Sequence, residues 1–315
     1  MAELKAMEMR EVLVAFLDTE LSKEKGNVVL LEADLASCSK TVPLMKKYPD
    51  KVINVGIAEQ NMCGAAAGLS AYGFVPFIHS FGPFVTRRIA DQLMISVCYA
   101  KQNVKIIGSD PGIAAELNGG THMPLEDIGM LRSIPNIVIY EPTDNVEFAQ
   151  ALPQILAYKG AVYVRMFRKV PSPIFEEGYK FDLFKANVLK PGKDVSIFAS
   201  GVMVQTAVNA AKLLEEEGIN AEIVVVPTVK PIDAAAIIKS VKKTGAAVTA
   251  ENHNVIGGLR SAVAEVLAEN YPAPLTSVGV KEKFGEVGKI GYLRKAFNLE
   301  EADIVAAAKA AIARK

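Results

Sequence analysis

The chain reads Val55-Gly56-Ile57-Ala58-Glu59-Gln60-Asn61-Met62 where a short apolar segment passes into a run rich in glycine and alanine that extends to Gly73. Residues 51–55 and residues 27–32 are aliphatic, β-branched and too short for helices, so each predicts a buried strand. The small residues after Ala58 predict a helix that packs closely against a neighbour. Glu59 falls in the first turn of this otherwise almost uncharged helix.

A carboxylate in that position has two interpretations. The structural one is that Glu59 complements the partial positive charge at the helix N-terminus. The functional one is that Glu59 is a buried acid able to hold or transfer a proton at neutral pH. The rest of the chain favours the functional interpretation.

Length and composition limit the kinds of protein that this chain can be. A chain of 315 residues suits two domains. The 35 basic residues balance the 35 acidic ones, which disfavours nucleic acid and anionic membranes as partners. No apolar run approaches the roughly 20 residues of a membrane span, and the N-terminus lacks a signal-peptide core. The three cysteines and three histidines lack metal-ligand spacing, so a reducing cytoplasm is expected.

Strands and helices alternate along the chain. Further strands are expected at 74–79, 104–109, 137–141 and 161–165, with helices near 85–100, 124–132 and 144–158. This alternation predicts a parallel sheet covered on both faces. Val170-Pro171-Ser172-Pro173 excludes a helix, and the alternation resumes at 194. We therefore expect an α/β protein of two domains, at 1–169 and 192–315, joined by a linker at 170–191.

Ligands of parallel α/β sheets bind beyond the carboxyl ends of the strands. In the first domain those ends carry a polar set: Asp34, Glu59, the 79–84 loop, the 109–122 loop, and Arg165 with Arg168. Phe81 and Phe84 suit core packing, or a stacking surface for a flat heteroaromatic ring. His122 follows a Gly-Gly-Thr turn, where a single His is more often structural than catalytic.

Residues 56–62 resemble the signature of the pyrimidine-binding domain of transketolase-like, thiamine-diphosphate-dependent enzymes. The resemblance extends in order over nearly the whole chain, through segments that read Ala33-Asp34-Leu35, Phe81-Gly82-Pro83-Phe84, Ala90-Asp91-Gln92, Gly120-Thr121-His122-Met123-Pro124, Glu126-Asp127 and Leu131-Arg132-Ser133-Ile134-Pro135-Asn136. The second domain is similar to the transketolase C-terminal domain.

The resemblance implies a role for each matching residue. Glu59 would hydrogen-bond N1′ of the cofactor's aminopyrimidine, Phe81 and Phe84 would flank that ring, and Asp34 would lie near the thiazolium. The cofactor would carry the carbanion chemistry. His122 would act in catalysis and contact the substrate. The remaining substrate contacts would fall on Arg10, Cys38, Ser109, Asn118, Arg165 and Arg168, with the arginines holding a sugar phosphate.

Three positions depart from the family pattern. The family usually has Ser where this chain has Cys38, His where it has Ser109, and Asp where it has Asn118. An asparagine can still bond a sugar hydroxyl, but without the carboxylate charge. These departures leave the particular sugar open.

The resemblance also implies a partner. Full-length enzymes of this type begin with a domain that binds the diphosphate and Mg²⁺, marked by Gly-Asp-Gly, and this chain contains no Gly-Asp-Gly. The chain therefore resembles the C-terminal subunit of a split transketolase. We expect a second polypeptide to supply the diphosphate domain and the Mg²⁺ ligands, in a mixed assembly of two copies of each chain, with this chain inactive alone.

Other functions stay open. Within the same chemistry, the chain could be a deoxyxylulose-phosphate-synthase-like enzyme or the β-type subunit of a 2-oxo-acid dehydrogenase E1. A non-catalytic assembly subunit is a different class, which the acid in an apolar helix start disfavours. In the second domain, Glu251-Asn252-His253 followed by Gly257-Gly258 suits either a structural role or an anion site.

Overall fold

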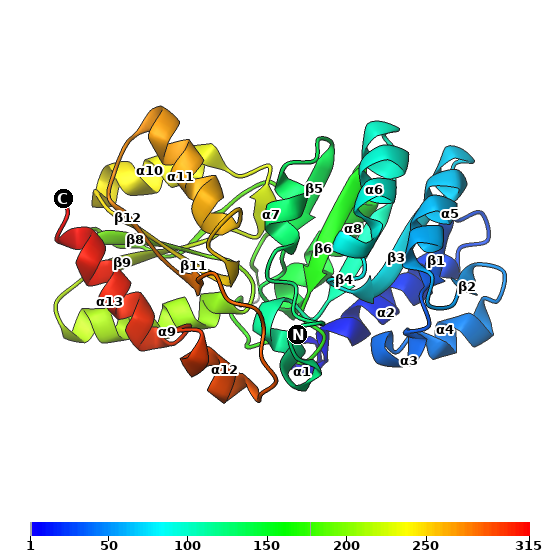
Figure 1. Ribbon diagram of the computed structural model, residues 1–315, viewed down its shortest axis with the longest axis horizontal. Helices are drawn as coiled ribbons and strands as arrows, with labels where there is room; N and C mark the ends of the chain where they lie inside the picture. Colours follow the sequence, from blue (N-terminus) through cyan, green and yellow to red (C-terminus); the bar gives the residue numbers. More distant parts are fainter. Residues whose placement is uncertain (1, 177) are drawn as a thin grey trace. The chain divides into compact units, whose positions relative to one another are not determined.

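The computed structural model describes residues 2–176 and 178–315 (Figure 1). The chain forms two units, each with its own sheet. The first contains residues 1–111 and 130–183, and the second contains residues 112–129 and 184–315. Within the described residues, no helix is long and apolar enough to span a membrane.

The first unit is built on a parallel sheet whose own strands run in the order β5-β6-β4-β3-β1-β2. Its strands are β1 (Val28–Glu32), β2 (Val52–Asn54), β3 (Val75–Phe81), β4 (Lys105–Ser109), β5 (Ile137–Tyr140) and β6 (Ala161–Met166). Its helices are α1 (Ala2–Ala6), α2 (Met9–Leu21), α3 (Ala36–Ser39), α4 (Val42–Lys47), α5 (Glu59–Ala71), η1 (Arg87–Ile89), α6 (Ala90–Gln92), η2 (Leu93–Tyr99) and α8 (Asn145–Ala157). Helix α7 (Asp127–Arg132) crosses the sequence boundary between the units.

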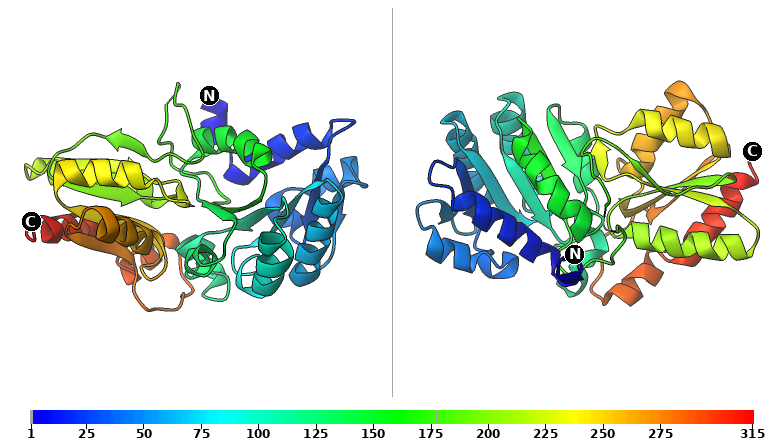
Figure 2. Two further views of the ribbon diagram at one scale, coloured as in Figure 1. Left: turned by 90° about the horizontal axis from the view of Figure 1, so that it is seen from above. Right: turned by 180° about the vertical axis from the view of Figure 1, so that it is seen from behind.

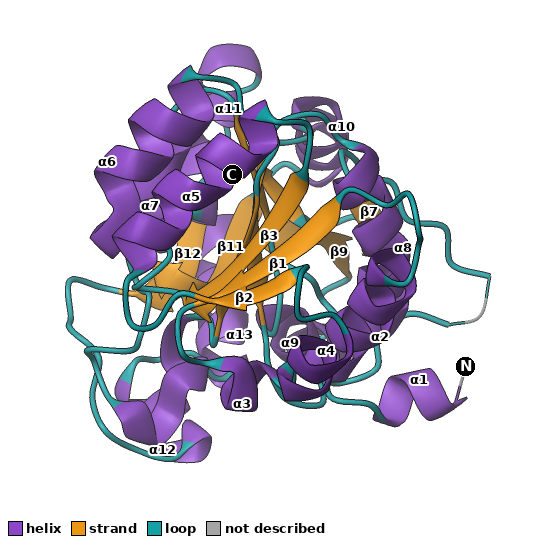
Figure 3. Cartoon of the chain, turned by 90° about the vertical axis from the view of Figure 1, so that its right-hand side faces the viewer, coloured by secondary structure: helices purple, strands orange, loops and turns teal. Residues whose placement is uncertain are grey.

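Helices cover both faces of this sheet. Helices α2 and α8 pack on one face, across the strands (Figure 2), and α5 and α6 lie on the other (Figure 3). Every residue of β1, β3, β4, β5 and β6 is buried, as expected for parallel strands between two helical layers.

The second unit has a sheet in the order β12-β11-β8-β9-β7, parallel except for β7 at its edge. Helices α10 and α11 pack on one face, and α9 and α13 on the other (Figure 1). The elements are η3 (Gly112–Asn118), β7 (Asn187–Lys190), β8 (Val195–Ala199), α9 (Met203–Glu216), β9 (Ala221–Val225), β10 (Thr228–Lys230), α10 (Ala234–Thr244), β11 (Ala247–Asn254), α11 (Leu259–Asn270), β12 (Leu275–Val280), α12 (Ile290–Ala296) and α13 (Glu301–Ile312).

The predicted α/β class with two mostly parallel sheets is confirmed. Three local predictions need correction. Strand β3 continues to Phe81, and β7 lies inside the predicted linker. The helix predicted at 85–100 is a 3-10 turn, a short α-helix and a π-helical stretch. Segment 112–129 lies within the predicted first domain, and its contacts group it with the second unit.

A fully buried acid near the start of α8 predicts a pH-dependent stability. Burial raises the pKa of Glu147 from 4.5 to about 8. Tyr140 Oη donates to Glu147 Oε1 at 3.0 Å, while Oε2 has no partner among the described residues. The folded state therefore keeps this proton as the pH rises from 4.5 to 8, whereas the unfolded state releases it. Stability from this group is fully present below pH 4.5 and is lost as the pH approaches 8.

Replacing Glu147 with Gln should remove that dependence. The amide is neutral at every pH and keeps an oxygen to accept from Tyr140. We expect Glu147→Gln to raise the free energy of unfolding by about 2 kcal/mol at pH 8.5 and to change it little at pH 5. Urea unfolding at the two pH values measures this. An equal change at both values would contradict the assignment of the proton to Glu147.

Candidate functional site

Glu59 begins α5, and its side chain is almost completely buried, with 2% exposed. Ser80 Oγ donates to Glu59 Oε1 at 3.2 Å, and Arg88 Nη1 donates to Oε2 at 2.7 Å. Arg88 comes from η1 and is 40% exposed. A carboxylate away from solvent is thus paired with one cation that reaches it from the surface.

Two aromatic rings lie beside this acid. Phe81 ends β3, and its ring meets that of Phe84 edge-to-face, with centroids 6.2 Å apart. The Arg88 guanidinium carbon lies 4.1 Å from the Phe84 centroid, and that of Arg168 lies 5.3 Å from the Phe81 centroid. Each ring therefore has a guanidinium over it, in a cation–π contact.

These side chains fit an aminopyrimidine. The Arg88 guanidinium is a flat group whose N–H donates to Glu59 while it stacks on Phe84. A protonated or amino-substituted pyrimidine has the same requirements, a carboxylate at its edge and an aromatic ring against its face. The sequence gives no sign that Arg88 contacts Glu59, since no feature of the surrounding residues distinguishes Arg88 from the neighbouring Arg87.

Arg10, a predicted anion-binding residue, lies in a charged network. Its guanidinium bonds Glu8 Oε2 through Nε and Nη2, both at 2.8 Å, and donates from Nη1 to the Cys38 carbonyl oxygen at 2.6 Å. Lys40 also contacts Glu8 and Glu11. Hydrogen bonds from Arg10 and Lys40 lower the pKa of Glu8 to about 2. Cys38 contributes its carbonyl to Arg10.

A buried polar chain runs under the carboxyl end of the sheet. His79 Nδ1 lies 2.9 Å from Glu32 Oε2, and His79 Nε2 lies 3.3 Å from Ser109 Oγ. Glu32 also accepts from Ser39 and Thr41. Burial alone would raise the pKa of Glu32, but the charge and hydrogen bond of His79 lower it. His79 was not singled out from the sequence, where its only signal is an imidazole at the end of a predicted apolar strand.

The two predicted arginines of β6 and the following loop have different surroundings. Arg168 forms a pair with Asp110, with Nη2 2.6 Å from Oδ2, and keeps 17% of its side chain exposed. Arg165 is completely buried, and its Nη1 lies 2.7 Å from Glu141 Oε1. The prediction of Arg165 as a substrate contact is therefore corrected, because its guanidinium is buried in an ion pair with Glu141.

Asp34 lies after β1 in a left-handed conformation with φ of 60°, and its side chain is exposed. Asn54 holds it in place, since its Oδ1 accepts from Asp34 N at 2.9 Å and its Nδ2 donates to Asp34 Oδ1 at 3.2 Å. Asp34 is therefore accessible at the same end of the sheet as Glu59 and Phe81.

Asn118 and His122 lie in the second unit. Asn118 is exposed at the end of η3, and His122 is half-buried, with Nδ1 2.9 Å from Thr121 Oγ1. The anion site considered at Glu251-Asn252-His253 is also corrected. The Glu251 carboxylate itself accepts from the first amides of α11, Leu259 N at 2.6 Å and Arg260 N at 2.9 Å. The chain's own acid thus occupies that helix N-terminus.

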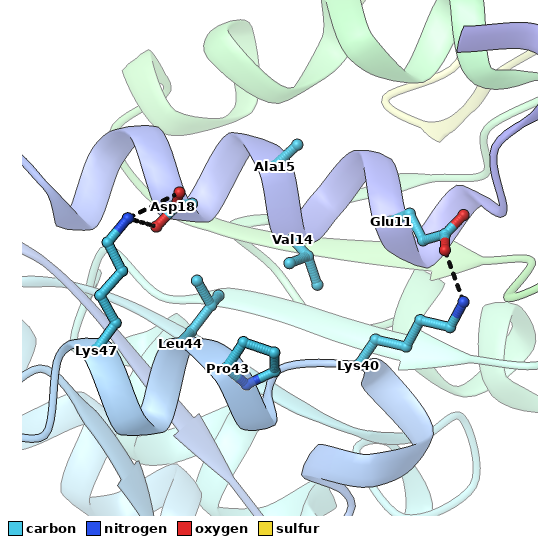
Figure 4. A pocket seen from close by; sticks show the side chains of 8 residues that line it. All are labelled: Glu11, Val14, Ala15, Asp18, Lys40, Pro43, Leu44 and Lys47. Carbon is cyan, nitrogen blue, oxygen red and sulfur yellow. Dashed lines mark hydrogen bonds and ion pairs between the residues drawn. The ribbon is translucent and has the colours of Figure 1, made fainter. Parts of the chain in front are cut away.

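A groove between α2 and the α3–α4 segment has a volume of about 400 Å³ (Figure 4). Val14, Pro43 and Leu44 give it an apolar lining, and ion pairs from Lys40 to Glu11 and from Lys47 to Asp18 bridge its two ends. It contains none of the predicted site residues. Among residues 2–176 and 178–315, no cluster of three or more His, Cys, Asp or Glu side chains is arranged to hold a metal ion.

Two known family models match most of this chain. Residues 5–171 match the transketolase pyrimidine-binding domain, and residues 184–304 match the transketolase C-terminal domain. The chain belongs to the transketolase family. This family uses thiamine diphosphate, for which the Glu59 and Phe84 environment is suited.

Several relatives are similar along most of their length. The 6-deoxy-6-sulfo-D-fructose transketolase subunit SqwH of Clostridium sp. (strain MSTE9) is 50% identical, over 94% of this chain and 92% of that protein. A putative transketolase C-terminal section of Methanocaldococcus jannaschii is 41% identical over 89% of each chain. A solved split-gene transketolase, described as an inactive β4 tetramer, is 40% identical with a TM-score of 0.89 and covers 98% of this chain and 99% of its own.

Deoxyxylulose-phosphate synthases are more distant. The 1-deoxy-D-xylulose-5-phosphate synthase of Heliobacterium modesticaldum is 33% identical over 93% of this chain, but the match covers 46% of that enzyme. The chain is therefore a member of the split-subunit branch of the transketolase family.

Proposed function

We propose that this chain is the pyrimidine-binding subunit of a split transketolase, which transfers a two-carbon ketol unit between anionic sugars. A partner chain supplies the diphosphate-binding domain and the Mg²⁺ ligands, and the complex works in the cytoplasm. The observation that carries the proposal is the buried Glu59 carboxylate, bonded at 2.7 Å to a planar N–H donor that stacks on Phe84.

Thiamine diphosphate, when bound, supplies the carbanion chemistry. Glu59 would hold the hydrogen bond to the pyrimidine nitrogen through the Oε2 atom that now accepts from Arg88. Phe81 and Phe84 would cover the ring and keep water from the carboxylate, which strengthens the charge coupling between Glu59 and the ring. His122 would bond the substrate.

The surface of α5 supports the requirement for a partner. The sequence predicted that its small residues pack against a neighbour, yet Gly64, Ala65 and Gly68 are exposed, and a Cβ atom at either glycine would meet nothing within 4 Å. Near the two ends of α5, Ile57 is 76% and Tyr72 is 88% exposed. This smooth surface with large apolar side chains at its borders suits a second subunit.

The substrate follows from charge chemistry. Arg10 and Arg168 can each exchange an acidic partner for an oxyanion, and guanidinium groups bind phosphate and sulfonate in the same bidentate way. The relative from Clostridium is named for a sulfonated ketose. We therefore propose a ketose that ends in a phosphate or sulfonate group.

The test measures ketol transfer to ribose 5-phosphate with thiamine diphosphate and Mg²⁺, by this chain alone and after addition of the diphosphate-domain chain. Xylulose 5-phosphate and 6-deoxy-6-sulfofructose serve as separate donors. Activity only in the mixture supports the proposal. The ketose that is consumed shows whether the substrate carries a phosphate or a sulfonate group. Consumption of pyruvate or another 2-oxo acid in place of a ketose would favour the two enzyme alternatives. A mixture that assembles but converts nothing would favour a non-catalytic subunit.

Arg88 predicts an effect on cofactor binding. Its pair with Glu59 must break before the pyrimidine reaches Oε2, so the guanidinium competes with the cofactor. Because Arg88 is partly exposed, this pair contributes little, and we expect Arg88→Met to tighten binding of thiamine diphosphate to the complex about threefold. Fluorescence titration measures this, with Arg87→Met as the matched control. Weaker binding in Arg88→Met alone would mean that Arg88 is a cofactor ligand.

A further inference from the structure

Segment 112–129 carries Asn118 and His122, the two residues of the second unit expected to contact substrate. It leaves β4 after Pro111 and makes no strand of its own. Its two ends are buried, at Gly112–Ala115 and at Met123–Leu125 with Asp127 and Ile128, while the part between them includes exposed residues. Something other than a sheet must therefore fix its conformation.

The carboxyl end of β11 provides that support. Asn252 Oδ1 accepts from Ile113 N at 2.9 Å, and Asn254 N donates to Leu125 O at 2.9 Å. Gly129 N donates to His253 Nε2 at 3.4 Å. Three successive residues of one strand thus bond the beginning, the later part and the end of the segment.

Close backbone packing strengthens these contacts. Gly112 has a φ of 50°, and a Cβ atom there would lie 2.2 Å from both the backbone and side-chain oxygens of Asn252. Gly257 has a φ of 80°, and a Cβ atom there would lie 2.7 Å from the Cα of Gly129. The segment therefore has no room to shift toward β11.

The end of β11 is itself rigid. Glu251, Asn252 and His253 are buried, with at most 1% of each side chain exposed. Glu251 holds the first two amides of α11, which fixes the strand end to a helix of 12 residues. Buried polar groups with good partners specify one conformation. The end of β11 is therefore rigid enough to hold segment 112–129 in one position.

We propose that Asn252 and His253 are positioning residues, which set the places of Asn118 and His122 by holding segment 112–129 at both ends. The second unit then contributes to substrate selection. This inference rests on the proposed function only in the role of Asn118 and His122 as substrate ligands. The hydrogen bonds that link Asn252, His253 and Asn254 to segment 112–129 lie within the second unit and do not depend on the proposed function.

The principal test replaces Asn252 with Ala, which removes the acceptor from Ile113 N. In the full chain, we expect backbone hydrogen exchange within 112–118 to accelerate about tenfold, because a buried amide loses its partner. In the complex with the diphosphate-domain chain, the KM for the ketose should rise about tenfold, while thiamine diphosphate affinity stays within about twofold.

Thr249→Val is the matched control, since Thr249 lies buried on the same strand and its hydroxyl has no partner among the described residues. Asn252→Asp retains the acceptor oxygen and should restore slow exchange. If Asn252→Ala unfolds, Gly112→Ala tests the same contact from the other side and should also raise the KM. Faster exchange without a change in KM would overturn the positioning role. An inactive wild-type complex would instead overturn the proposed function and leave the exchange result intact.

Discussion

Glu59→Gln should lower ketol transfer by the complex about 10²- to 10⁴-fold and leave assembly unchanged. Glutamine has nearly the same shape and can still bond a ring nitrogen. It cannot carry the negative charge or exchange the proton that a carboxylate shares with the pyrimidine. Because the site is dry, with 2% of Glu59 exposed, solvent cannot replace that charge. Steady-state kinetics measure the loss, and light scattering checks the assembly.

Glu301→Gln is the matched control for this substitution. Glu301 is also the first residue of a helix, and Arg294 Nη2 lies 2.9 Å from its Oε2, as Arg88 Nη1 lies 2.7 Å from Glu59 Oε2. If Glu59 only complemented its helix dipole, both substitutions would cost less than about 1 kcal/mol of stability and neither would affect the rate. Full activity of Glu59→Gln would therefore restore the structural interpretation.

Arg165→Met should destabilise the fold by about 3–5 kcal/mol, because it leaves the Glu141 carboxylate buried without its cation. Arg165 has no exposed surface, and its Nη1 lies 2.7 Å from Glu141 Oε1. Arg10→Met should cost only about 1 kcal/mol, since that pair is partly solvated and Lys40 remains beside Glu8. Arg10→Met should mainly raise the KM for the anionic ketose.

Urea unfolding of the two variants separates a structural arginine from a substrate arginine. A double variant, Arg165→Met with Glu141→Leu, removes both charges and should recover much of the lost stability. If Arg165→Met and the wild type have the same free energy of unfolding and the variant has a higher KM for the ketose, Arg165 would be a substrate ligand after all.

Several features were predictable because their signals are local. The alternation of short aliphatic segments with longer periodic ones identified the α/β class and most strand positions. Glu59 was placed in the first turn of its helix, which begins at that residue in the structure. The strand ends were less predictable. Phe81 was assigned to a loop and lies in β3, since Ser80 and Phe81 pair with β4 through contacts that sequence periodicity does not report.

The sequence by itself determined the class of fold, the family and the acid on which the chemistry is expected to depend, because each follows from residue order within short segments. Only the tertiary structure decided which polar and charged groups meet. Arg88 reaches Glu59 across 29 positions, Arg165 reaches Glu141 across 24, and Asn252 holds Ile113 across 139. Burial of Arg165 and partial exposure of Arg10 likewise depend on how helices cover the sheet. The residues near each partner in the sequence do not indicate these contacts. Their energies arise only when segments far apart in the sequence pack together and remove water from between them.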